Sequence, residues 1–165
     1  MTSAKSGANL QTTATSIRMG EIAVGRDEES IHTLLGSCIG LALYDRRNRV
    51  GGLAHIVLPE SRGNDGSPGK FADTAIPELI RLIKQTAGTP GKLSAKLVGG
   101  ACMFQTSSAS NIGERNLESI ERLLKTARIP IVASHCGGDR GRRMTLVAGS
   151  GRVRIEVVGH ELIEI

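Results

Sequence analysis

The sequence predicts a single-domain α/β (α+β) sandwich of mixed, largely antiparallel β-sheets with two main amphipathic helices. Three observations predict it. The chain has 165 residues, the size of one domain that can bury a core without disulfides. Short apolar runs bounded by Gly, Pro, Asn and Asp recur at the length of strands. Two longer segments carry apolar residues at helical spacing.

The composition changes near Ile17. Residues 1–16 are rich in Ser, Thr and Ala, and we expect them to form a flexible N-terminal tail. This segment has no apolar run and therefore does not resemble a secretory signal. From residue 17 onward the sequence contains neither a linker nor an internal repeat, which predicts one folded domain over residues 17–165.

Roughly seven strands are expected from the apolar runs. They occupy residues 31–35, 38–44, 50–58, 93–97, 129–133, 144–148 and 153–158. Pro59 ends the third of them, and the following segment, 61–69, contains Gly, Asn and Pro and is expected to be a loop. The last two strands flank Gly149-Ser150-Gly151-Arg152, a sequence suited to a hairpin turn.

The two helices are expected over residues 71–87 and 111–128. The apolar face of the first helix consists of Ile76, Leu79, Ile80 and Ile83. That of the second consists of Leu117, Ile120, Leu123, Leu124 and Ala127. Pro77 either lies in the first turn of the first helix or marks a kink in it.

The composition argues against several classes of function. With one Tyr, two Phe and no Trp, the chain lacks the aromatic platforms of single-stranded nucleic-acid binders. The three cysteines are widely spaced and form no zinc pattern, so we expect reduced thiols in a cytoplasmic protein, with no metal or other cofactor. No stretch approaches the roughly 18 apolar residues of a membrane span. The formal charge of +5 fits an acidic protein partner at least as well as nucleic acid.

One predicted hairpin brings two chemically useful residues together. If its turn is Arg46-Arg47, Cys38 lies directly opposite His55, with the two Cβ atoms about 4.5–5.5 Å apart. A slip of one residue would turn one side chain to the other face, whereas a slip of two would leave the pair as diagonal neighbours. A nearby imidazole can take the proton of a thiol and leave a thiolate that attacks carbonyl carbon. The same residues are also compatible with a small core cysteine and a structural histidine.

A set of three residues that precede Cys38 in the sequence also fits hydrolytic chemistry. Gly36 and Ser37 leave room for a substrate and expose backbone N–H groups that can stabilise an oxyanion. Thr33 is placed to orient the imidazole, as a third group does in catalytic triads. The candidate catalytic residues are therefore Cys38, His55 and Thr33, with Gly36 and Ser37 as the oxyanion and substrate loop.

Six motifs follow one another along the chain after residue 16. They are TLLGSC (33–38), GLAHIVLP (52–59), KFAD (70–73), VGGACMF (98–104), IGERN (112–116) and GGDRGR (137–142). Together they resemble the signature of the CheD family, chemotaxis proteins that act as chemoreceptor glutamine deamidases. The resemblance covers residues 17 to 158, nearly the whole predicted domain.

The resemblance implies a Cys nucleophile, a His base and a Thr that supports the His, which fall on Cys38, His55 and Thr33. It implies a protein-glutamine glutaminase that converts receptor glutamines to glutamates through a thioester, with loss of ammonia. Hydrolysis of glutamate methyl esters by the same acyl chemistry is also implied. The implied partners are the cytoplasmic helices of chemoreceptors and a CheC-type phosphatase, and the implied location is the cytoplasm.

A function of another class stays open, namely a non-catalytic adaptor that binds receptor helices or a CheC-type phosphatase. The family usually carries acidic residues before the double glycine, where this chain has Ser134-His135-Cys136. Between residues 138 and 154 a single acid, Asp139, accompanies five arginines, namely Arg140, Arg142, Arg143, Arg152 and Arg154. They form either an ordinary solvated face or a surface that attracts acidic receptor helices.

Overall fold

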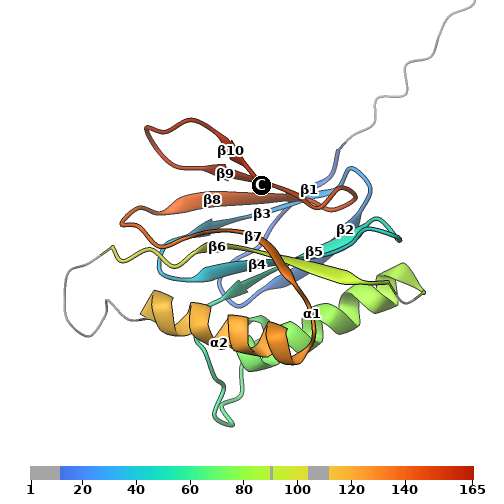
Figure 1. The fold of residues 1–165 in the computed structure, drawn as a ribbon, viewed down its shortest axis with the longest axis horizontal. Helices are drawn as coiled ribbons and strands as arrows, with labels where there is room; N and C mark the ends of the chain where they lie inside the picture. Colours follow the sequence, from blue (N-terminus) through green and yellow to red (C-terminus); the bar gives the residue numbers. More distant parts are fainter. Residues whose placement is uncertain (1–11, 90, 104–111) are drawn as a thin grey trace, which may run out of the picture.

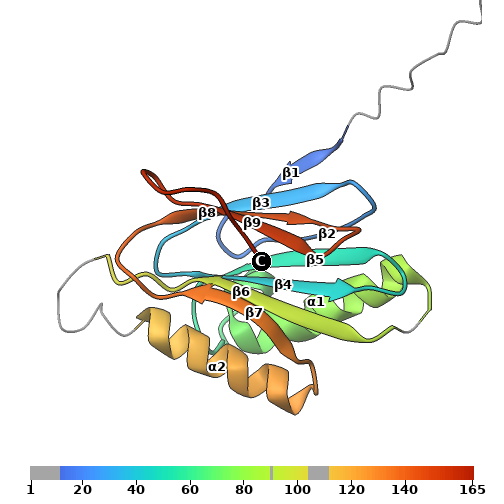
Figure 2. The same cartoon turned by 45° about the horizontal axis from the view of Figure 1, so that its top comes forward.

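The computed structural model describes residues 12–89, 91–103 and 112–165, and these form three layers (Figure 1). Two five-stranded sheets lie face to face, and both helices cover the far side of one of them. The outer sheet has the strand order β1-β3-β8-β9-β10. The central sheet, with the order β2-β5-β4-β6-β7, lies between the outer sheet and the helices (Figure 2). The predicted α+β sandwich is confirmed.

The strands are β1 (Ala14–Ser16), β2 (Ile22–Arg26), β3 (Ser30–Leu35), β4 (Ile39–Asp45), β5 (Val50–Ile56), β6 (Leu93–Gly99), β7 (Ile131–Cys136), β8 (Arg142–Val147), β9 (Arg152–Glu156) and β10 (Ile163–Glu164). The helices are the short 3-10 helix η1 (Pro68–Lys70) and the α-helices α1 (Ala72–Ala87) and α2 (Ile112–Thr126). β1 pairs with β3 and β6 pairs with β7 in parallel, and the other pairs are antiparallel. No helix of the described residues is long and apolar enough to cross a membrane.

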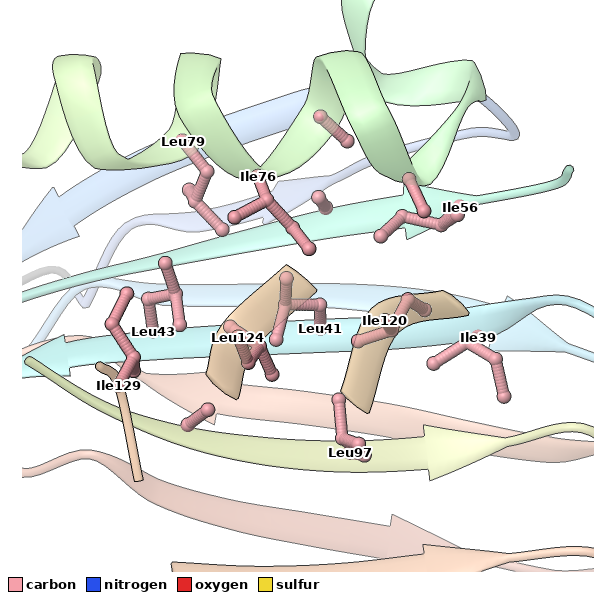
Figure 3. Close-up of a cluster of buried hydrophobic side chains, with 14 of the residues drawn as sticks. Ile39, Leu41, Leu43, Ile56, Ile76, Leu79, Leu97, Ile120, Leu124 and Ile129 are labelled. Carbon is pink, nitrogen blue, oxygen red and sulfur yellow. The ribbon is translucent and has the colours of Figure 1, made fainter. Parts of the chain in front are cut away.

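The central sheet is buried on both faces, which explains the nearly continuous apolar runs of β4 and β5. Ile39, Leu41 and Leu43 alternate along β4 toward the helices and join Leu79 and Leu124 in the core on that side (Figure 3). The intervening residues of β4 and β5 face the outer sheet instead. Their inter-sheet core comprises Cys38, Ala42, Leu53, Val98, Leu35, Ile31, Met144, Leu146 and other apolar residues.

The register of the β4–β5 hairpin differs from the predicted one by two residues. Asp45 pairs with Val50, and Gly40 lies opposite His55. The turn is longer than expected because the Asp45 carboxylate accepts hydrogen bonds from the backbone N–H and side-chain amide of Asn48, at 3.1 and 2.7 Å. Arg49 closes this four-residue turn with a φ of 54°, in the left-handed region. Cys38 is therefore not directly opposite His55, but the two remain on one face because strand periodicity is two residues.

Three short strands at the sheet edges were not predicted. β1 lies within residues 1–16, so the expected flexible tail is wrong for Ala14–Ser16, and residues 1–11 lie outside the described part. All three residues of β1 are exposed, and only backbone pairing with β3 orders them. β2 and β10 are also edge strands. Pro77 is the sixth residue of α1 and therefore lies beyond the predicted first turn.

Candidate active site

The candidate site residues gather where the chain passes from the outer sheet to the central sheet. Thr33 lies in β3, Gly36 and Ser37 form the connection, and Cys38 directly precedes β4. His55 lies one residue before the end of β5, opposite Gly40. Because Cys38 and Gly40 are two residues apart, the thiol and the imidazole face the same inter-sheet layer as diagonal neighbours.

The His55 imidazole is held by a hydroxyl from the opposite sheet. The Thr33 Oγ1 lies 2.7 Å from His55 Nδ1 and donates its own proton to the Ile17 carbonyl at 2.8 Å. Since that proton is used, Oγ1 accepts from Nδ1–H, and the other ring nitrogen, Nε2, carries the lone pair. Nε2 is buried and has no hydrogen-bond partner within the described residues. The structure therefore presents an unprotonated, unengaged imidazole nitrogen in the layer that also holds Cys38.

A strap between β1 and β2, residues 17–21, completes this arrangement and was missed by the sequence reasoning. The Ile17 carbonyl fixes the direction of the Thr33 hydroxyl. The backbone N–H of His55 donates to Glu21 at 3.1 Å, and the His55 carbonyl accepts from Gly20 at 2.9 Å. These contacts use backbone atoms, so no side-chain pattern could have revealed them.

Burial shifts both titratable groups toward their neutral forms. Desolvation lowers the pKa of His55 from its ordinary value of 6.5, and only 3% of this residue is exposed. Desolvation also raises the pKa of the Cys38 thiol above its ordinary value of 9.0. At neutral pH the resting site therefore contains an imidazole and a thiol rather than an ion pair.

Glycines at the end of β6 support the loop that carries Cys38. Gly100 N–H donates to the Cys38 carbonyl at 2.9 Å, and Ala101 N–H donates to the Gly36 carbonyl at 2.9 Å. Gly99 adopts a φ of 114°, and a Cβ there would collide with the Cys38 carbonyl oxygen. The N–H groups of Ser37 and Cys38 donate to no acceptor in the described part of the chain.

Asn116 ties α2 to the strand that carries His55. Its side chain is fully buried, and its Nδ2 donates to the Val57 carbonyl at 2.9 Å, two residues after His55. Its Oδ1 has no partner among the described residues. The IGERN motif therefore contributes a buried side chain, Asn116, that fixes the backbone just after His55.

Arg142 is buried, which corrects its expected place in a solvated arginine face. It is 6% exposed, and its guanidinium donates to the carbonyls of His135, Gly137 and Arg140 as well as lying 2.8 Å from His135 Nδ1. It thereby holds the turn after β7. Arg152 and Arg154 are exposed, as a solvated face requires, and both pair with Glu164, at 3.7 and 3.4 Å.

The turn held by Arg142 is connected to the loop that carries Cys38. Gly137 N–H donates to the Gly99 carbonyl at 2.9 Å, and Cys102 N–H donates to the Gly138 carbonyl at 2.8 Å. Gly137 and Gly138 have φ values of 85° and 74°, which L side chains rarely adopt. The GGDRGR motif is therefore tied by backbone hydrogen bonds to the segment that supports the Cys38 loop.

Another cysteine and histidine, Cys136 and His135, are adjacent at the end of β7. Cys136 is half-buried, and burial raises the pKa of its thiol to about 11. His135 is engaged by Arg142. Cys102 and His160 are exposed. Within the described ranges no three His, Cys, Asp or Glu residues are grouped as metal ligands. Phe104 of the VGGACMF motif lies outside the described residues.

Comparisons with known proteins agree with the motifs. Residues 57–157 match the family model described as CheD chemotactic sensory transduction. Proteins named probable chemoreceptor glutamine deamidase CheD, from Methanococcus vannielii, Clostridium botulinum and Pyrococcus abyssi, are 43%, 40% and 42% identical over 141, 162 and 154 residues. These alignments cover 84%, 94% and 90% of this chain, and 92%, 100% and 94% of the relatives. The chain therefore belongs to the CheD family.

Proposed function

We propose that this chain is a chemoreceptor glutamine deamidase that uses Cys38 as nucleophile and His55 as base. The observation that carries the proposal is the buried Nε2 of His55, which has no hydrogen-bond partner among the described residues. Its partner nitrogen is held by Thr33, and the imidazole faces the same buried layer as the Cys38 thiol. The names of the relatives supply the substrate class, a glutamine side chain of a chemoreceptor.

The first step is transfer of the Cys38 proton to His55 Nε2 as sulfur attacks the carboxamide carbon of the glutamine. Both groups are neutral at rest, so the thiolate forms only as the proton moves. Diagonal neighbours on a sheet lie about 7–8 Å apart between Cα atoms, and their side chains are closer. Hydrogen bonds between catalytic groups commonly shorten only when substrate binds.

The tetrahedral intermediate carries a negative oxygen that the N–H groups of Ser37 and Cys38 stabilise. One such donor is worth about 3–4 kcal/mol in well-studied hydrolases. The imidazolium then gives its proton to the amide nitrogen, the C–N bond breaks, and ammonia leaves behind a thioester. Water, deprotonated by His55, attacks the thioester and releases glutamate and the Cys38 thiol. A glutamate methyl ester would follow the same path with methanol as the leaving group.

The test is incubation of the wild-type protein with a chemoreceptor cytoplasmic fragment, followed by peptide mass spectrometry and an ammonia assay. We expect specific glutamines to become glutamates with one ammonia released per site. Binding of the fragment without any such conversion would contradict the proposal and support the adaptor function. The same assay on methyl-esterified fragment measures the esterase activity.

Replacing Thr33 with valine is expected to lower kcat about 10- to 100-fold, a typical loss when the group that orients a functional histidine is removed. Valine keeps the shape of threonine but leaves His55 Nδ1–H without the acceptor that fixes its tautomer. Thr33→Ser keeps the hydroxyl and serves as the matched control. Steady-state kinetics of both variants check this, and equal activities for Val and Ser would contradict it.

A further inference from the structure

Arg142 carries a buried charge, and no carboxylate of the described residues forms an ion pair with it. Its guanidinium donates instead to three backbone carbonyls, those of His135, Gly137 and Arg140. Removal of a charge from water is costly unless other polar groups replace the lost hydration. A buried arginine that is bound by carbonyls rather than by a carboxylate is therefore expected to serve the arrangement that these bonds create.

The Arg142 side chain joins the two sheets. Arg142 is the first residue of β8 in the outer sheet, and its cross-strand partner is Leu35 of β3. Leu35 belongs to the inter-sheet core, and directly opposed residues point to the same face of a sheet, so Arg142 also points toward the central sheet. There its Nη1 donates to the His135 carbonyl at 2.8 Å, and His135 belongs to β7, an edge strand of the central sheet. The guanidinium therefore clamps an outer-sheet strand to a central-sheet strand.

This clamp lies at the end of the sandwich where the chain twice changes sheet. Residues 36–38 lead from β3 to β4 and carry Cys38, and residues 137–141 lead from β7 to β8. In the outer sheet β3 and β8 are neighbours, and in the central sheet only β6 separates β4 from β7. The strand registers bring the ends of these strands together, so the two connections cross between the sheets at the same end.

Hydrogen bonds connect the guanidinium to the Cys38 loop through the second of these connections. Nη2 of Arg142 donates to the Gly137 carbonyl. The N–H of Gly137 donates to the Gly99 carbonyl at 2.9 Å, and the next residue, Gly100, donates its N–H to the Cys38 carbonyl at 2.9 Å. A displacement of the turn held by Arg142 is therefore passed on to Cys38 by backbone atoms.

The spacing of the sheets at this end also controls the proposed base. Thr33 of the outer sheet reaches across the layer to His55 of the central sheet, with 2.7 Å between Oγ1 and Nδ1. The cross-strand partner of Thr33 is Met144, only two residues after Arg142. A hydrogen bond is lost at a separation of about 3.6 Å, so a shift of roughly 1 Å between the sheets would release the imidazole.

We propose that Arg142 is a positioning residue of the active site, which holds the Cys38 loop and the Thr33–His55 pair in place by clamping β8 to β7. The proposal rests on the proposed function and adds to it a residue that acts through its neighbours rather than on the reacting atoms. The planar fork of a guanidinium binds several carbonyls in a fixed geometry, which a single ammonium group does not reproduce. The clamp therefore requires arginine rather than lysine.

Arg142→Lys tests this role because it keeps the positive charge and removes the fork. We expect kcat for deamidation of a receptor fragment to fall about 10- to 100-fold with little change in KM, a typical loss when a group that orients a functional residue is removed. Arg81→Lys is the matched control, since the Arg81 fork binds Glu78 on the exposed side of α1, with two contacts of 2.8 Å. Thermal melting verifies that both variants are folded at the assay temperature. Equal kcat in the two folded variants would overturn the proposal.

Alkylation of Cys38 by iodoacetamide, followed by peptide mass spectrometry, gives a readout that needs no receptor. In wild type the labelling rate is expected to fall at acid pH as His55 is protonated. In Arg142→Lys this dependence is expected to weaken, because the thiol and the imidazole are no longer aligned. A residue that only stabilised the fold would lower the melting temperature and leave this pH profile unchanged, and that result would contradict positioning. If wild type itself lacks the decline, the proposed function is wrong and the positioning role fails with it.

A second variant displaces the clamped turn without touching Arg142. Gly137 has a φ of 85°, and a Cβ there would have no heavy atom within 4 Å, so Gly137→Ala strains only the backbone. Gly63→Ala is the matched control, because Gly63 has a φ of 76° and equally open surroundings in the loop after β5. We expect Gly137→Ala to lower kcat several-fold, with little change in KM, and Gly63→Ala to keep the wild-type value. Equal kcat in the two alanine variants would overturn the proposed route from the turn to Cys38.

Discussion

Replacing Cys38 with alanine is expected to lower deamidation of a receptor fragment by at least about 10³-fold, because the covalent route through the thioester disappears. The substitution removes only a sulfur atom from the inter-sheet core, so the fold is expected to persist. Peptide mass spectrometry of the receptor fragment measures the loss, and circular dichroism with thermal melting verifies the fold. Cys38→Ser is expected to lose most activity as well, since a hydroxyl is a weaker nucleophile than a thiol at this position.

Cys136 supplies the matched control for this substitution. It is another partly buried thiol, and burial raises its pKa to about 11, so it is protonated at neutral pH. Its side chain packs against the core on the helix side of the central sheet, away from the layer that holds Cys38. Cys136→Ala is therefore expected to retain activity. Full activity in Cys38→Ala, or loss restricted to Cys136→Ala, would contradict the assignment of the nucleophile.

The parts of the fold that could be predicted are those where apolar burial sets a period. Both helices and four strands of the central sheet, β4 to β7, follow from this, since β4 alternates between two apolar cores. The strands that escaped prediction have little such signal. β1 buries nothing and exists through its backbone pairing with β3, and β10 is only two residues long.

The candidate site could be predicted as a set of residues but not as a geometry. The hairpin register depends on how the Asp45 carboxylate caps its turn, which shifted Cys38 from a direct to a diagonal position relative to His55. The tautomer of His55 depends on a backbone carbonyl of Ile17, far from it in sequence. Arg142 looked like one of five surface arginines and is instead buried among carbonyls. Each outcome depends on backbone atoms, which a sequence motif does not reveal.

Replacing His55 with asparagine is expected to lower kcat/KM about 10²- to 10⁴-fold, the usual contribution of a general acid–base group. Asparagine keeps an N–H donor for Thr33 but has no basic nitrogen at the position of Nε2. In wild type, kcat/KM should fall on the acid side as His55 is protonated. Because burial lowers the pKa of His55, this decline is expected below pH 6.5, and activity should be constant from there to neutrality.

The pH dependence of Cys38 alkylation distinguishes a base from a merely structural histidine. The pKa of the Cys38 thiol is raised by burial, so without His55 the thiolate forms only in strongly alkaline solution. In wild type, iodoacetamide should therefore label Cys38 at neutral pH. The labelling rate should fall at acid pH (the acid limb of its pH profile) in the same way as kcat/KM. In His55→Asn that limb should vanish, and labelling should rise only with alkaline ionisation of the thiol. If the acid limb persisted in a folded His55→Asn variant, another group would be the base and His55 would act only through packing.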